Sequence, residues 1–237
     1  ARNWRHEQSV ARRILERIQV LDTQPFARMA ELQDLFPPRN PPIPGPNYQK
    51  IATALATRGN LLILTGGPGT GKTFTVVRIL ALLLSASPGL RILLAAPTGK
   101  AAARLTESIM GSLKSLPEAI RDKIPSKAST IHQMLGSQKH TRQFRHHARN
   151  PLHADVVVID EASMIDLERM AALMEALPPR ARLILVGDKD QLSSVEAGSV
   201  MGDLCRDLEI RGYSAETSDW IQGATGERLN AAMGSQC

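Results

Sequence analysis

The chain has 237 residues, of which 43% are hydrophobic and 22% charged, so it is long enough to bury one large core or two small ones. No run approaches the ~18 apolar residues that a membrane span needs, and the first residues lack the apolar stretch of a secretion signal, so neither feature is expected. Cys205 and Cys237 are too few for a disulfide framework or a zinc cluster, and they fit a reducing compartment such as the cytoplasm.

Charge is unevenly distributed along the chain, although the net charge is only +6. Residues 91–150 carry 11 basic and 3 acidic side chains, whereas residues 151–237 carry 7 basic and 15 acidic ones. A basic block inside a globular chain indicates either a polyanionic partner or simply a solvated face. The aromatic content of 3% argues against a site that binds bases mainly by stacking.

The first 46 residues predict helices followed by a linker. Residues 5–21 place apolar side chains at helical spacing, and a shorter helix is expected near residues 27–35. Six prolines within residues 37–46 exclude a helix or a central strand, so this segment is the best linker candidate. Residues 1–46 are therefore interpreted as the helical remnant of an N-terminal domain plus a Pro-rich linker.

From residue 47 onward, short apolar runs alternate with helical patterns. The runs that predict buried strands are residues 61–65, 91–96, 155–160 and 182–187. The helical patterns between or after them are residues 73–84, 99–110 and 165–177. This alternation predicts an α/β fold with a parallel sheet covered by helices on both faces. We expect it to span residues 47–210, and the polar residues 211–237 to form a truncated, partly disordered tail.

The strongest motif follows the first predicted strand and opens the first predicted helix of this domain. It reads Gly66-Gly67-Pro68-Gly69-Thr70-Gly71-Lys72-Thr73 and fits the P-loop pattern G-x-x-x-x-G-K-[ST]. The glycines let backbone amides surround phosphate oxygens, and the helix N-terminus adds partial positive charge. Lys72 is expected to reach the β- and γ-phosphates, and the Thr73 hydroxyl to bind Mg²⁺. The chain is therefore predicted to bind a nucleoside triphosphate.

Two acidic or polar segments follow later predicted strands. Asp160 is expected at the carboxyl edge of the sheet, where it can hold Mg²⁺, and Glu161 is placed to act as general base for an attacking water. The same Asp-Glu pair could also be only a helix start. In the segment from Leu185 to Leu192, Gln191 can contact the γ-phosphate or the water and Asp188 can fix neighbouring groups, unless the segment is a plain turn.

Five segments together resemble the RecD family, the alpha subunits of bacterial exodeoxyribonuclease V, which are superfamily 1 DNA helicases. In order, they are TGGPGTGKT, AAPTGKAAARLTESI, STIHQMLG, NPLHADVVVIDEASMIDL and VGDKDQLSSVEAG. The resemblance covers about residues 47–205 and implies a RecA-like P-loop motor domain. It further implies 5′→3′ translocation on single-stranded DNA, RecB and RecC subunits as partners, and a role in double-strand break repair.

The resemblance also implies roles for individual residues. Gln49 matches the position where such helicases recognise adenine. Thr98, Lys100 and Arg104 match a motif that contacts the single-strand backbone, and their place at a predicted helix N-terminus within the basic block agrees with that role. His132 matches another DNA-side motif, although a packing or capping histidine is an equally good interpretation.

The later helicase motifs, including the arginines that a second RecA-like domain supplies, are not found in residues 206–237. We therefore expect a fragment that binds ATP and Mg²⁺ but is incomplete for unwinding. Two alternatives stay open: a P-loop kinase, which the base-like Glu161 argues against, and an ATP-binding scaffold that does not hydrolyse. DNA-stimulated hydrolysis distinguishes the motor from both alternatives.

Overall fold

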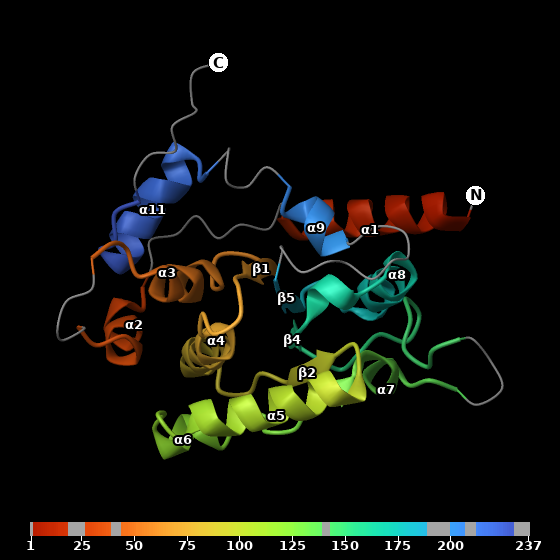
Figure 1. The fold of residues 1–237 in the computed structure, drawn as a ribbon, viewed down its shortest axis with the longest axis horizontal. Coiled ribbons are helices and arrows are strands. Elements are labelled where there is room, and N and C mark those ends of the chain that lie inside the picture. Colours follow the sequence, from red (N-terminus) through yellow and green to blue (C-terminus); the bar gives the residue numbers. More distant parts are fainter. Residues whose placement is uncertain are drawn as a thin grey trace.

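The computed structural model describes residues 2–18, 27–38, 44–138, 143–188, 200–206 and 212–229. At its centre lies a five-stranded sheet with the strand order β1-β5-β4-β2-β3 (Figure 1). The strands are β1 (Leu61–Thr65), β2 (Ile92–Ala96), β3 (Ser129–Thr130), β4 (Val156–Ile159) and β5 (Arg182–Gly187). Every neighbouring pair is parallel, so the carboxyl ends of the strands meet at one edge of the sheet. The predicted parallel α/β fold of a RecA-like domain is confirmed.

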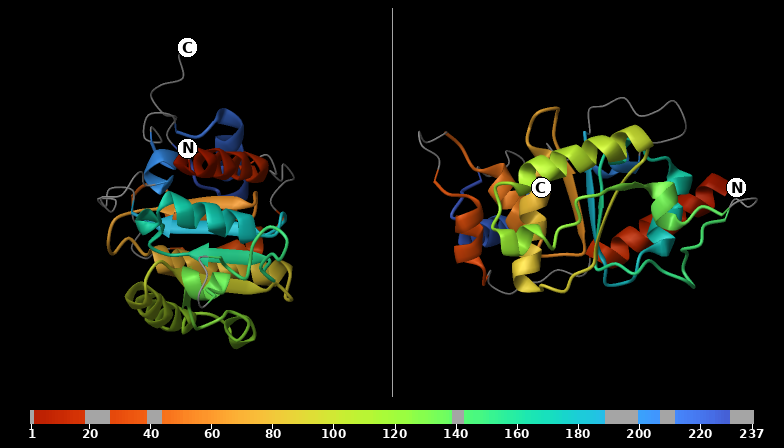
Figure 2. Two further views of the ribbon diagram at one scale, coloured as in Figure 1. Left: turned by 90° about the vertical axis from the view of Figure 1, so that its right-hand side faces the viewer. Right: turned by 90° about the horizontal axis from the view of Figure 1, so that it is seen from below.

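Helices cover both faces of this sheet (Figure 2). They are α3 (Tyr48–Leu55), α4 (Lys72–Ala86), α5 (Gly99–Leu113), α6 (Glu118–Arg121), α7 (Ile131–Leu135), α8 (Leu167–Ala176) and α9 (Val200–Leu204), with a 3-10 turn, η1 (Ala162–Met164). Alternate side chains of the strands enter two separate cores, because successive residues of a strand point to opposite faces. Val156 and Val158 pack with α4 and α5, whereas Val157 and Ile159 pack with α8.

The two N-terminal helices pack against this sheet domain. Helix α1 (Arg2–Ile18) lies along α8 and places Val10 in the same core as Val157. Helix α2 (Met29–Leu35) packs against α3 and α4, with Leu32 fully buried. These contacts attach both helices to the sheet domain, and a domain boundary near residue 46 stays a prediction.

A helix that the sequence analysis missed, α11 (Ala215–Thr225), lies in the segment expected to be a weakly ordered tail. Its N-cap Ser214 accepts a hydrogen bond from the Thr217 amide, and Gly226 ends the helix in the left-handed conformation. Ile221 and Ala224 are buried, and α11 packs on α3 and α2. Tertiary packing therefore stabilises a helix whose own periodicity is weak.

No helix in the described parts of the chain is both long enough and apolar enough to cross a bilayer.

Candidate nucleotide-binding site

The glycine-rich loop connects β1 to α4, as its sequence context predicts. Gly69 and Gly71 have φ angles of +75° and +81°, a region that side chains with a Cβ rarely adopt. A Cβ on Gly71 would also lie 2.5 Å from Nε2 of Gln49. The turn of the loop therefore favours glycine at position 71, and a Cβ there would also displace the end of the Gln49 side chain.

Lys72 is the first residue of α4, and its half-buried side chain reaches back over the loop. Its Nζ donates to the carbonyl oxygens of Gly66, at 2.6 Å, and Gly67, at 2.9 Å. A bound phosphate can exchange with these carbonyls as a partner of the ammonium group, and the N-terminus of the 15-residue helix α4 adds partial positive charge. The loop thus has the charge and shape that a triphosphate needs.

Gln49 lies in the first turn of α3 and contacts the same loop. Its Nε2 donates to the Thr70 carbonyl oxygen at 3.0 Å, while the Thr70 hydroxyl donates to the Gly67 carbonyl at 2.9 Å. The adenine-recognition residue implied by the resemblance is therefore brought to the P-loop, 21 residues further along the chain.

Asp160 directly follows β4, and its backbone amide donates to the Ala95 carbonyl of β2 at 2.9 Å. Burial raises the pKa of the Asp160 carboxyl, while the Glu161 amide and the Lys72 ammonium oppose that shift. The Asp160 carboxylate and the Thr73 hydroxyl are oxygen donors of the kind that Mg²⁺ prefers, and the Thr73 hydroxyl makes no hydrogen bond with another described residue. This donor set fits Mg²⁺.

Glu161 has a φ angle of +52° and is the one non-glycine residue with a positive φ among those described. This left-handed conformation costs roughly 1 kcal/mol for a residue with a Cβ, and such costs cluster at functional sites. Glu161 lies in the turn between the end of β4 and the start of η1. The direction of its side chain is therefore set by this turn and not by the strand.

The polar segment predicted after the strand at residues 182–187 lies only partly within the described residues. Asp188, at the end of β5, is buried, and Gly187 before it is closely packed, because a Cβ there would meet Met201 Sδ at 2.7 Å. Gln191 lies outside the described residues, so its role stays a prediction.

The predicted DNA residues of α5 face the same edge of the sheet. Thr98 caps α5 by accepting a hydrogen bond from the Ala101 amide at 3.2 Å. Lys100 and Arg104 are exposed and lie four residues apart, which places them on one face of the helix. These three side chains line a hollow of about 280 Å³ together with Asp160, Glu161 and Met164. Met164 has no role predicted from the sequence, because no local pattern marks it.

His132 is not one of the residues that line this hollow. Its ring packs edge-on against Phe144 with a centroid distance of 5.7 Å, on a helix that begins with a capping box of Thr130 and Gln133. The packing interpretation of His132 therefore has a structural basis, and contact with DNA remains a prediction from the resemblance.

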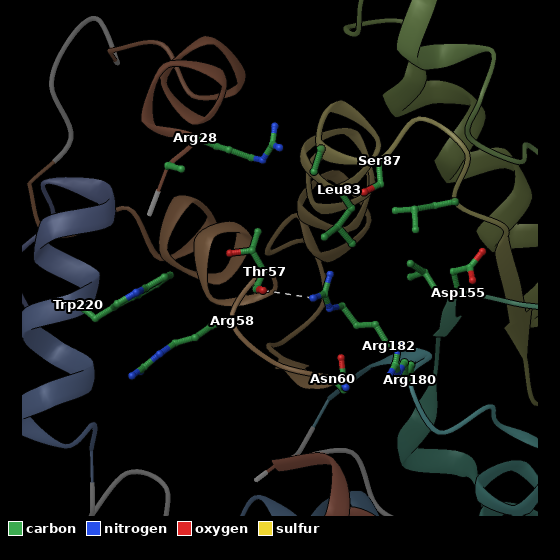
Figure 3. A pocket seen from close by; sticks show the side chains of 14 residues that line it. Arg28, Thr57, Arg58, Asn60, Leu83, Ser87, Asp155, Arg180, Arg182 and Trp220 are labelled. Carbon is green, nitrogen blue, oxygen red and sulfur yellow. Dashed lines mark hydrogen bonds between the residues drawn. The ribbon is translucent and has the colours of Figure 1, made fainter. Parts of the chain in front are cut away.

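A second cavity, of about 510 Å³, lies at the opposite edge of the sheet, where β4 and β5 begin (Figure 3). Arg182 enters it from the start of β5 and donates from Nε to Gly59 O at 2.7 Å and from its terminal nitrogen to Thr57 O at 3.2 Å. None of the predicted nucleotide or DNA residues lines this cavity. The candidate nucleotide site is therefore confined to the carboxyl edge.

Comparison with known proteins agrees with this geometry. The AAA domain family model matches residues 49–197. The chain is 44% identical to the RecBCD enzyme subunit RecD of Mycolicibacterium smegmatis over 220 residues, covering 90% of this chain and 38% of that protein. It is 40% identical to the subunit of the same name from Haemophilus influenzae over 246 residues, covering 100% of this chain and 37% of that protein.

A further similarity is to the ATP-dependent RecD2 DNA helicase of Deinococcus radiodurans, at 43% identity over 138 residues, which is 58% of this chain and 17% of that protein. The resemblance to RecD that the motifs indicate is thus confirmed over most of the chain. The chain spans less than two fifths of the length of the RecD relatives it matches.

Proposed function

The chain belongs to the AAA domain family, a family of nucleotide-binding proteins, and we propose that it is the ATP-binding motor domain of a DNA helicase subunit. The observation that carries the proposal is the hollow shared by Asp160, Glu161, Lys100 and Arg104. In it, carboxylates suited to phosphate hydrolysis lie beside cations suited to a phosphate backbone. A site of this kind can couple ATP hydrolysis to movement along DNA.

Each residue has a role in the proposed reaction. Lys72 binds the β- and γ-phosphates, and Gln49 recognises adenine. Glu161 accepts the proton of the attacking water, and Gln191 orients that water or the γ-phosphate. Thr73 and Asp160 hold Mg²⁺, which when bound neutralises charge on the phosphate oxygens.

The proposed substrate of movement is single-stranded DNA. Lys100 and Arg104 lie exposed on one face of α5 and can contact successive phosphates of a strand, while Thr98 at the helix N-terminus can contact another. Such contacts bind any sequence, as a motor that moves along DNA requires. The names of the RecD relatives, which are subunits of a RecBCD enzyme, support RecB and RecC as partners. We propose 5′→3′ translocation and a role in double-strand break repair from the resemblance of the sequence motifs.

ATP hydrolysis by the chain, measured with and without single-stranded DNA, tests this proposal. We expect ATP binding that Lys72→Ala weakens on the order of 100-fold, because two charge-assisted hydrogen bonds to phosphate are lost. Lys123→Ala, which removes an exposed lysine outside the site, is the matched control and is expected to bind ATP like the unmodified chain.

The outcomes separate the proposed function from its alternatives. DNA-stimulated hydrolysis that Lys72→Ala abolishes supports the motor. Binding without any hydrolysis, even when DNA and the partner subunits are present, favours an ATP-binding scaffold. Transfer of phosphate to a nucleoside or sugar favours a kinase, and equal ATP affinity of the Lys72→Ala and unmodified chains contradicts the P-loop assignment.

A further inference from the structure

Polar contacts near both ends of helix α11 join this helix to α3 and to the turn that follows α3. Near its start, Arg58 donates to the Thr217 hydroxyl at 3.0 Å and pairs with Glu216 at 3.1 Å. The Arg58 guanidinium also lies 5.3 Å from the ring centroid of Trp220, and Figure 3 shows both side chains at one wall of the cavity.

The other end of α11 contacts the first turn of α3. Lys50 Nζ donates to the Thr225 carbonyl at 2.7 Å, and the Asn47 backbone amide donates to Glu227 Oε2 at 3.0 Å. The segment from Thr225 to Glu227, which we call the turn 225–227, is itself ordered, because the Glu227 amide donates to the Thr225 hydroxyl and Gly226 is left-handed. Glu227 is therefore a fixed acceptor at the N-terminus of α3.

The same first turn of α3 carries Gln49, whose side chain bonds to the P-loop carbonyl of Thr70. Asn47 caps this turn by accepting from the Lys50 amide at 3.2 Å. A carboxylate that accepts from an amide at a helix N-terminus stabilises that end of the helix. Glu227 thus bonds to the residue that caps α3, and Gln49, two residues further along the same turn, bonds to Thr70 of the P-loop.

We propose that the turn 225–227 positions the base end of the nucleotide site, with Glu227 as a positioning residue for Gln49. The inference rests on the proposed function, in which Gln49 recognises adenine. A glutamine amide can both accept from the adenine amino group and donate to N7, and guanine presents an acceptor where adenine presents that amino group. This discrimination depends on the orientation of Gln49, whereas the triphosphate is bound by Lys72 and the loop. Substitution of Glu227 is therefore expected to weaken recognition of the base and to leave binding of the phosphates unchanged.

The test compares the affinities of the chain for ATP, GTP and inorganic tripolyphosphate in three variants. Glu227→Ala is expected to weaken ATP binding on the order of three- to tenfold, as one lost hydrogen bond predicts, and to reduce the preference for ATP over GTP by the same factor. Tripolyphosphate binding is expected to be unchanged. Glu227→Gln keeps an acceptor oxygen and is expected to restore ATP binding.

Glu216→Ala is the matched control, because it removes a carboxylate contact at the opposite end of the same helix. It is expected to leave all three affinities unchanged, with thermal unfolding recorded for each variant. An equal loss of ATP preference in Glu216→Ala would overturn the inference, since general docking of α11 would then be the cause. Unchanged ATP preference in Glu227→Ala would overturn it as well, while the proposed function would stand. An unmodified chain that binds neither ATP nor tripolyphosphate would instead overturn the proposed function and the inference together.

Discussion

Strand β4 has an aspartate at each end, and the surroundings of the two carboxyl groups differ. Asp155, before the strand, accepts from the Arg91 amide at 2.9 Å and from the Arg91 side chain at 3.0 and 3.1 Å. These hydrogen bonds hold the pKa of Asp155 below its usual value. Asp160, after the strand, is more deeply buried and has a raised pKa.

The difference in surroundings indicates a stabilising role for Asp155 and a functional role for Asp160. At the amino edge the charge of Asp155 is neutralised by Arg91, and this pairing joins the start of β4 to the start of β2. At the carboxyl edge, burial of Asp160 disfavours its ionised form, and the nearby Lys72 compensates only in part. A half-buried carboxylate whose ionised form is disfavoured attracts a cation, and perturbed pKa values of this kind cluster at functional sites.

The largest expected effect is on ATP hydrolysis, and it tests whether the two ends of β4 differ in function. Glu161→Gln, next to Asp160, is expected to lower turnover at least 100-fold, because a general base contributes about 10²–10⁴-fold, and to keep ATP affinity within about twofold. Asp155→Asn, at the other end of the strand, is expected to leave both unchanged. Steady-state hydrolysis together with equilibrium binding measures the two quantities. Full turnover in Glu161→Gln would mean that another group is the base.

A smaller effect is expected on the salt dependence of DNA affinity, and it distinguishes the two ends of the neighbouring strand β2. Lys100, beyond its carboxyl end, is expected to contact single-stranded DNA, whereas Arg91, before its amino end, pairs with Asp155. Lys100→Ala is expected to reduce the slope of log affinity against log salt by about 0.7, the value for one phosphate contact of a single strand. Arg91→Ala removes the same charge and is expected to leave the slope unchanged. Equal slopes for all three chains would place Lys100 away from the DNA path.

How much of this arrangement the sequence could predict depends on the range of the interactions involved. The P-loop, Asp160 and Glu161 are recognisable because a strand, a turn and a few residues of fixed type carry the whole signal. Four of the five strands in the described residues were predicted to within one residue at each end, since buried parallel strands are continuous apolar runs. The two-residue strand β3 was not predicted, because Ser129 and Thr130 form no apolar run. The left-handed conformation of Glu161 and the hollow that it shares with Lys100 depend on the order of strands in the sheet, which local patterns do not encode.

Helix α11 illustrates what sequence analysis cannot reach. Its buried apolar residues, Ile221 and Ala224, are too few to produce a clear apolar stripe. The contacts that hold it join residues 158 to 180 positions apart in the chain. Only the packing of α3 against α11 brings Glu227 to Asn47, so no motif could have indicated that this segment contacts the first turn of α3.

The smallest expected effect is on stability, and it has opposite signs at the two ends of β4. The pKa of Asp155 is lower in the folded chain than in the unfolded chain, so its contribution to stability is present above the unfolded pKa and is lost as pH falls through the folded pKa. The pKa of Asp160 is raised, so its ionised form destabilises the fold above the folded pKa, and this cost disappears as pH falls through that value.

Replacing each aspartate by a neutral asparagine is expected to shift the melting temperature at pH 7, in opposite directions for the two residues. Asp160→Asn is expected to raise the melting temperature, and Asp155→Asn to lower it slightly, because the Asp155–Arg91 pair is exposed and screened by solvent. A change of 1 kcal/mol corresponds to about 2–4 °C for a domain of this size, which thermal unfolding resolves. Both shifts are expected to shrink in acid, where the carboxyl groups are protonated in the unmodified chain. A lower melting temperature for Asp160→Asn at pH 7 would mean that the Asp160 carboxylate is stabilised in the fold by contacts that outweigh its burial, and the contrast between the two ends of β4 would be lost.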